Sequence, residues 1–419
     1  MIDTLEVDSL KPHRTAPSYS GISAYNNGYF FLALLSCFLF PFASILFIIL
    51  YVRSEKHSSV GLAILVGLCA GSIAYGVNTT LMADIDRYTN SLPIFRETAF
   101  WDLLSIKGVY SSVGSHGYNL FAWVVSQFGD DQLLRGAVTA TFYSILAFVV
   151  DDYARLHGWS YGRTCAALFA SVAIPPFFNV LSYAKSTPAF SVLLLALYLD
   201  FGKRAKPVVL VLLYAFAASI HSSVLPVIAL RVLLLFVKNE VVIYGVSLAL
   251  LPLSNLLSAA LPASFRAIPV LSLFVSALDK FSVYSEFSDW GWAAASQHSV
   301  LLMGYRYYFG AVAILCILLV FGRFDISKNG LLVFSGVWSA LCIAVSVFFA
   351  ADVFFRYAMP CSTLFVLAAL SYKNDAASLF INIALAVFAV VGFAVQWAYL
   401  ASVADISRFI LHGLFGVLF

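Results

Sequence analysis

Long apolar runs recur along this chain of 419 residues, and they limit its fold more than any other feature. Clear examples cover residues 30–52, 60–82, 133–150, 330–350 and 376–400. Each run is near the ~20 residues that an α-helix needs to cross the hydrocarbon of a bilayer. The apolar residues are continuous rather than alternating, and a helix satisfies its own backbone hydrogen bonds in hydrocarbon. The runs therefore predict membrane-spanning helices.

The composition of the chain also indicates a non-aqueous environment. Hydrophobic residues make up 62% of the chain and charged residues 11%. An ordinary soluble domain has roughly 25% charged residues, more than twice the fraction found here. We predict an all-α fold, a polytopic integral membrane protein of about 11–12 transmembrane helices. Two larger outer loops, about 83–131 and 260–300, are expected to contain interfacial helices.

Positive charges are distributed unevenly between short and long loops. Many lysines and arginines lie in short loops such as 53–57, 151–163 and 203–206. The positive-inside rule places these loops in the cytoplasm and the two longer loops outside. An extracytoplasmic N-terminal tail, residues 1–27, then precedes a single transmembrane domain, residues 28–419. The tail lacks the basic-then-apolar order of a cleaved signal peptide.

Helix-breaking or polar residues interrupt two apolar stretches. The proline pair at 175–176 predicts a break, because proline removes a backbone donor and kinks a helix. The stretch 208–237 is too long for one crossing, and we expect it to turn near His221 at or below the outer surface. In the first outer loop, segments 92–104 and 118–128 mix aromatic and polar residues, which is typical of interfacial helices.

An acidic, basic and aromatic cluster follows the second apolar run, and it contains Asp84, Asp86, Arg87 and Tyr88. Carboxylates at this spacing can hold a divalent metal beside a phosphate, or one of them can act as a general base. The alternative is a solvated loop start in which Arg87 pairs with a neighbouring aspartate. Ionisable groups at a membrane surface are costly, so the cluster is a candidate for chemistry.

Cations on the outer side form a second candidate set, and they come from different loops. Arginine suits phosphate because its planar fork donates two parallel hydrogen bonds. The alternative is that each cation extends toward lipid headgroups. His221, at a helix break, is either a structural histidine or a functional group. The cations are Arg87, Arg96, Arg135, Lys185, Lys280, Arg306 and Arg356.

Several familiar sites are absent from the sequence. It contains no Walker A, GxSxG, HExxH, EF-hand or dinucleotide-binding motif, so coupling to ATP is unsupported. The six cysteines lie in or beside apolar runs and form no CxxC pair, which argues against a disulfide framework or a zinc site. We predict no cofactor, no resident metal and no nucleic-acid partner. Next to the basic loops, Asp151 is interpreted as flanking a span and His57 as a surface residue.

The order of these motifs resembles the bacterial exopolysaccharide polymerase family of the EpsG type, which is related in role to the Wzy O-antigen polymerases. The resemblance covers roughly residues 27–400 and rests on short motifs in a set order. Lys185 stands where the family usually has arginine. The motifs are Asp84 to Tyr88, Gly117 to Phe121, Ser182 to Ala189, Ala218 to Ser223, Asp279 to Tyr284, and Arg356 with Tyr357.

The resemblance implies a glycosyltransferase of the bacterial inner (cytoplasmic) membrane, with its active site facing the periplasm or exterior. Such an enzyme transfers the growing glycan from undecaprenyl pyrophosphate to the terminal sugar of an incoming lipid-linked repeat unit. It needs no nucleotide. The implied partners are undecaprenyl-pyrophosphate-linked oligosaccharides, the lipid bilayer, and flippase and chain-length regulator proteins.

The implied site divides into catalytic and substrate-binding residues. Asp84 or Asp86 would act as the base or orient the acceptor, with His221 as a competing base. The cations would bind pyrophosphate, and the aromatic and polar residues of the later outer loop would contact sugar. The substrate-binding set is Arg87, Tyr88, Arg96, Lys185, Lys280, Tyr284, Arg306 and Arg356.

Other functions compete with this interpretation. A lipid-linked oligosaccharide flippase or other transporter is expected to show an internal repeat and ionisable residues at mid-membrane. Here no repeat is visible, and charge gathers on one face. A glycosyltransferase that uses a polyprenyl-phosphate sugar differs in the single phosphate of its donor. A polysaccharide acyltransferase is the weakest alternative, because His221 alone provides no acyl-transfer arrangement.

Overall fold

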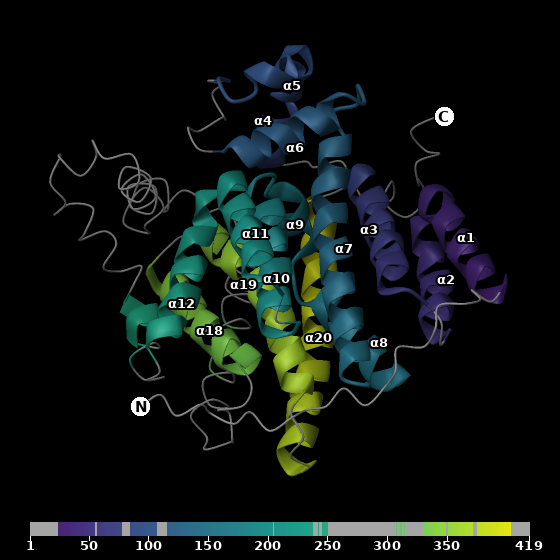
Figure 1. Cartoon of the computed structure of the whole chain (residues 1–419). Coiled ribbons are helices and arrows are strands. Elements are labelled where there is room, and N and C mark those ends of the chain that lie inside the picture. The colour runs from purple at the N-terminus through teal and green to yellow at the C-terminus, as the bar shows by residue number, and fades with distance from the viewer. Residues whose placement is uncertain are drawn as a thin grey trace, which may run out of the picture.

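The computed structural model describes residues 24–54, 57–77, 84–106, 115–203, 205–237, 330–348, 351–371 and 375–403, with a few residues between 242 and 314. All regular secondary structure in these ranges is helical, and they contain no strand. The all-α prediction is therefore confirmed for this part of the chain. Figure 1 shows long helices gathered side by side and shorter helices across one end of them.

The long helices form the body of the molecule. Two of them, α10 and α19, are buried along most of their length, which is typical of helices that are apolar on every side. α7, α8, α11, α18 and α20 pack against one or both of this pair, whereas α3 packs against α7 with α1 and α2 beside it. The long helices are α1 (Ala24–Leu39), α2 (Pro41–Arg53), α3 (Ser59–Tyr75), α7 (Leu133–Leu156), α8 (Tyr161–Ala173), α10 (Ser186–Phe201), α11 (Pro207–Ile220), α12 (Leu225–Phe236), α18 (Gly330–Phe348), α19 (Ala351–Leu370) and α20 (Asp375–Val403).

Two described helices are long and apolar enough to cross a membrane, namely α7 and residues Val353–Leu370 of α19. Of their apolar windows, 61% and 100% respectively are buried, and the core helix of a soluble protein can have the same length and composition. Eight further apolar helices of 10–17 residues occur in the described chain. The predicted number of crossings stays a prediction.

The predicted first outer loop carries several short helices, as the sequence predicts. We call residues 84–126 of this loop the outer segment. They lie at the top of the bundle in Figure 1, across the ends of the long helices. Leu92 and Phe95 face inward and anchor them to the main core, whereas Trp101 is 84% exposed. The short elements are α4 (Asp84–Thr89), α5 (Leu92–Glu97), the 3-10 helix η1 (Phe100–Asp102) and α6 (His116–Ser126).

Both predicted helix breaks are present at this same end. The proline pair separates α8 from the short helix α9 (Phe177–Ser182), and α10 begins at Ser186. His221 ends α11 with extended backbone (φ −154°, ψ 127°), and the 3-10 helix η2 (Ser222–Val224) leads into α12. The chain therefore places Lys185 and His221 at helix ends below α4 and α6, where their side chains can meet residues of the outer segment.

Small residues let α3 and α7 approach closely. Gly67 and Gly71 lie one turn apart on α3 and face the backbone of α7. A Cβ at Gly71 would lie 2.9 Å from the Gly136 carbonyl oxygen, and one at Gly67 would lie 2.9 Å from that of Ala140. No side chain fits at such distances, because a backbone carbonyl cannot move aside. Glycine is therefore required at both α3 positions by packing.

A buried polar cluster joins α3 to the other end of α7. The Asp151 carboxylate accepts hydrogen bonds from His57 Nε2 at 2.8 Å, Ser59 Oγ at 2.5 Å and Arg155 Nε at 2.8 Å. His57 Nδ1 also lies 2.8 Å from the Ser54 carbonyl oxygen. The interpretation of His57 as a surface residue is therefore wrong, since its side chain is only 10% exposed. Asp151 lies near the end of α7, as expected, but its carboxylate is a buried acceptor in this cluster. The bond from His57 to Asp151 spans 94 positions of sequence, which no local pattern reveals.

We predict that Gly71→Ala destabilises the protein and that Gly162→Ala does not. Crowding at Gly71 costs about 1–3 kcal/mol, more than the ~1 kcal/mol that alanine adds to helix propensity. A Cβ at Gly162 meets no atom within 4 Å, so the same substitution there is a matched control. Thermal unfolding of the purified chain measures both. Equal midpoints for Gly71→Ala and Gly162→Ala would contradict the close packing of α3 on α7.

Candidate functional site

Lys185 lies between two tyrosine rings at the start of α10. Its side chain is buried, with only 6% of the residue exposed. The Nζ atom lies 5.3 Å from the ring centre of Tyr88 on α4 and 5.0 Å from that of Tyr118 on α6. These distances are within the range of cation–π attraction, which strengthens when the cation is removed from water. Lys185 thus connects the core of the bundle to two helices of the outer segment.

Tyr118 adds a polar group to this site. The rings of Tyr88 and Tyr118 pack edge to face, with their centres 5.5 Å apart. Burial, with a smaller contribution from Tyr88, raises the pKa of the Tyr118 hydroxyl well above its usual value. The group is therefore neutral at physiological pH. Its oxygen has no hydrogen-bond partner among the described residues, so it can donate to a bound ligand.

Arg356 forms a second buried cation beside a third tyrosine. It lies on α19 and is 7% exposed. Its Cζ atom is 4.8 Å from the ring centre of Tyr183. The hydroxyl of Tyr183 accepts a hydrogen bond from Asn179 Nδ2 at 2.7 Å, which holds the ring in place. Tyr183 is two residues before Lys185, so the short segment between α9 and α10 contributes to both cation–aromatic contacts.

His221 lies on the adjoining break between α11 and η2. Its Nδ1 accepts a hydrogen bond from the backbone N–H of Ser223 at 3.0 Å. A neutral ring in this arrangement carries its proton on Nε2, so it offers a donor rather than a base. A second hydrogen bond also holds the break in place: the Tyr357 hydroxyl donates to the Ser223 carbonyl oxygen at 2.7 Å. The break is therefore tied to the residue that follows Arg356.

Close packing brings α6 against the same break. A Cβ at Gly117 would lie 2.5 Å from Ser219 Oγ and 3.0 Å from the backbone nitrogen of Ile220. Glycine is therefore needed for α6 to lie against the end of α11. Since Gly117 precedes Tyr118 and Ile220 precedes His221, this contact places the Tyr118 and His221 segments side by side (Figure 1).

Asp86 is held by a salt bridge that sequence spacing did not predict. Its Oδ1 lies 2.5 Å from Nη2 of Arg135 on α7, and Arg135 Nη1 donates to the Val77 carbonyl oxygen at 2.7 Å. Arg135 is 5% exposed. The pair joins α4 to the start of α7, so Asp86 has a structural partner 49 positions away. Arg87, the local partner considered from the sequence, is exposed.

Of the remaining predicted site residues, Arg96 forms a salt bridge at the surface, and three others lie outside the described residues. Arg96 pairs with Asp131 at 2.6 Å and donates to the Ser126 carbonyl oxygen at 2.9 Å, which ties α5 to the end of α6. Asp84 is the first residue of α4. Within the described ranges, no group of three or more His, Cys, Asp or Glu side chains is placed to hold a metal ion. Outside the described residues lie Lys280, Tyr284 and Arg306.

The structure thus brings together Tyr88, Lys185, His221 and Arg356 from the predicted set. Sequence reasoning did not single out Tyr118 or Tyr183 as site residues, although each lies within a motif that was noticed. The signal that could have found them is an aromatic residue next to a polar helix break. Comparisons of this chain with protein-family models, with curated proteins and with solved structures find no match.

We predict that Asp86→Asn lowers the stability of the fold by about 1–3 kcal/mol, because Arg135 then keeps a buried charge without its carboxylate. Asp102→Asn, on the exposed η1 element of the same segment, is the matched control. Thermal unfolding of the purified variants measures the difference. A midpoint for Asp86→Asn that equals the control would show that the salt bridge contributes nothing.

Proposed function

We propose that this chain is a polytopic protein of the bacterial inner membrane. The first support is its apolar exterior. Large hydrophobic side chains are exposed on α1, α11, α12 and α20, and examples are Phe31 at 63%, Val208 at 70%, Phe236 at 78% and Val390 at 61%. Soluble monomers rarely expose such side chains over so many helices. Hydrocarbon tails are the environment that suits these surfaces.

The packing of α3 on α7 supports the same placement. Small residues one turn apart, such as Gly67 and Gly71, are typical of helix pairs in lipid, where close backbone approach replaces the hydrophobic effect as the source of attraction. The positive-inside rule then orients the bundle with His57 and Arg155 toward the cytoplasm and with α4 to α6 outside.

We infer that the outer site belongs to a polysaccharide polymerase that acts on undecaprenyl-pyrophosphate-linked oligosaccharides. The observation that carries this proposal is the convergence of Lys185 and Arg356, two buried cations from distant parts of the chain, each against tyrosine rings. Cations suit the phosphates of such a donor, and aromatic faces suit sugar rings. The order of motifs that resembles the exopolysaccharide polymerases points to the same substrate class.

The proposed reaction transfers the growing glycan to an acceptor sugar. The acceptor hydroxyl oxygen attacks the anomeric carbon of the glycan, and the bond from that carbon to the pyrophosphate oxygen breaks. Undecaprenyl pyrophosphate leaves with the electron pair, and the hydroxyl proton passes to a base. Charge develops on the departing pyrophosphate, so preorganised cations and donors there lower the barrier.

The geometry suggests a division of roles. Lys185 and Arg356 would stabilise the departing pyrophosphate, and the hydroxyl of Tyr118 with Nε2–H of His221 would donate hydrogen bonds. Asp86 is engaged by Arg135, which leaves Asp84 as the stronger candidate for the base. Arg87, Lys280, Tyr284 and Arg306 complete the proposed substrate-binding set from the sequence.

We predict that Lys185→Ala and Arg356→Ala each lower polymer formation about 10²-fold, the usual loss when one transition-state donor is removed. Lys206→Ala is the matched control, since this exposed lysine precedes α11 at the end opposite His221. Lys185→Arg, which restores the residue usual in the resembled family, is expected to keep activity. Polymer length is read on a gel from cells in which each variant is the sole copy.

Lipid intermediates in the same cells separate the competing functions. The proposal expects single repeat units on a pyrophosphate-linked lipid to accumulate on the outer face. Accumulation of a polyprenyl-monophosphate sugar would instead support the alternative glycosyltransferase, and accumulation on the inner face would support a flippase. Full-length polymer in both alanine variants would contradict the site.

We also predict that Asp84→Asn and Asp86→Asn fail in different ways. If Asp84 is the base, Asp84→Asn lowers polymer formation about 10²–10⁴-fold and leaves the unfolding midpoint unchanged. Asp86→Asn is expected to lower the midpoint because Arg135 loses its partner. Polymer length and thermal unfolding are measured on both variants. Normal polymer from Asp84→Asn would remove Asp84 from the mechanism.

A further inference from the structure

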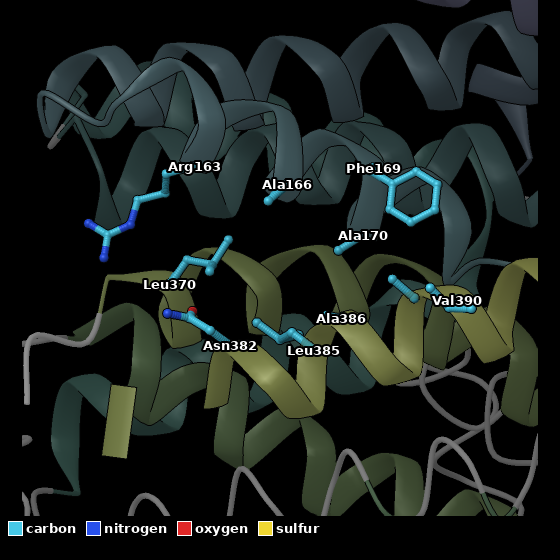
Figure 2. Close-up of a pocket in the computed structure, with 10 residues that line it drawn as sticks. Arg163, Ala166, Phe169, Ala170, Leu370, Asn382, Leu385, Ala386 and Val390 are labelled. Atoms are coloured by element: carbon cyan, nitrogen blue, oxygen red, sulfur yellow. The ribbon is translucent and has the colours of Figure 1, made fainter. Parts of the chain in front are cut away.

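A groove separates α8 from α20 at the end of the bundle away from Lys185 and Arg356. Its volume is about 270 Å³ (Figure 2). The helices are in contact beyond one end of the groove: a Cβ on Gly392 would lie 3.0 Å from the Ala173 carbonyl oxygen, Gln396 donates a hydrogen bond to that oxygen, and the ring centres of Phe169 and Phe393 are 6.2 Å apart. From there toward the start of α8, alanines on both helices leave the space open. Its apolar lining includes Ala166, Phe169, Ala170, Leu385, Ala386 and Ala389.

The groove is polar at one end only. Figure 2 shows Arg163 and Asn382 at this end, and Phe169 and Val390 at the other. The guanidinium of Arg163 lies 5.5 Å from the ring centre of Trp159. Among the described residues it forms no ion pair, so its charge can bind an external anion. Phe169 and Val390 are 48% and 61% exposed, so the apolar end opens to the surroundings of the bundle.

The dimensions and polarity suit a lipid. Arg163 and Phe169 are six residues apart on α8, a rise of about 9 Å. Asn382 and Val390 are eight residues apart on α20, a rise of about 12 Å. A groove of this length, with a cation at one end and alanine walls, can hold part of an acyl chain and the phosphate attached to it. Its walls lack the hydrogen-bonding groups that a sugar would need.

We propose that this groove binds one anionic phospholipid of the cytoplasmic leaflet. Arg163 binds its phosphate, Asn382 donates to a headgroup or ester oxygen, and an acyl chain lies along the alanines toward Phe169 and Val390. The positive-inside rule puts Arg163 at the cytoplasmic surface, where anionic lipids attract basic residues. The inference rests on the proposed membrane placement and is independent of the polymerase activity.

Native mass spectrometry of the full chain in detergent tests this site. The probes are phosphatidylglycerol and phosphatidylcholine at equal concentration, which share acyl chains and differ in net charge, and glycerol 3-phosphate in a separate arm. We expect one phosphatidylglycerol to be retained in preference to phosphatidylcholine. Arg163→Gln is expected to lower that preference about ten-fold, because a charge-assisted hydrogen bond is lost.

Two further variants keep the test decisive. Ala386→Phe fills the groove and is expected to remove the bound lipid of either kind, while Arg53→Gln, an exposed arginine at the same end that does not line the groove, is expected to change nothing. Equal retention of both lipids, or no effect of Arg163→Gln, overturns the proposal. Retention of glycerol 3-phosphate without lipid indicates a free phosphate site and overturns it. A change of oligomeric mass in Ala386→Phe with lipid still bound shows that a second copy fills the groove, and this also overturns it.

Discussion

The burial of the Lys185 ammonium between Tyr88 and Tyr118 joins the outer segment to the helix bundle, and the candidate site depends on it. A charge removed from water needs compensation, and the two ring faces supply part of it. Each ring comes from a different short helix of the outer segment. Those helices are too short to be stable alone, so their positions follow from the contacts that they make with the core.

The helix breaks make this contact possible. A continuous helix through residues 161–201 would carry Lys185 along one wall of the bundle. The proline pair instead ends α8, and the chain passes through α9 before α10 begins at Ser186. A second break at His221 brings Ser223 to Tyr357, the neighbour of Arg356. These two helix breaks thereby bring Lys185, His221 and Arg356, which come from three separate segments of the chain, to the same end of the bundle.

Much of the local structure could be predicted from the sequence, and the pairing of residues could not. The breaks at 175–176 and His221 follow from proline and polar residues in apolar runs, which act over a few positions. Tyr118 and Lys185 are 67 positions apart, and their contact depends on how α6 folds back over α10. Likewise, the salt bridge from Asp86 to Arg135 joins residues that lie 49 positions apart. Chain topology, which sequence spacing does not encode, decides such contacts.

The two ends of the bundle use polar groups in different ways. At the end that holds the last turns of α7, Asp151 accepts hydrogen bonds from His57, Ser59 and Arg155, and both nitrogens of the His57 ring face acceptors. A network of this kind holds helices together and has no group left for chemistry. At the opposite end, the Tyr118 hydroxyl lacks a partner among the described residues, and the buried cations Lys185 and Arg356 lie against tyrosine rings. This difference is the physical reason for proposing that the chemistry takes place at the end that holds Lys185 and Arg356.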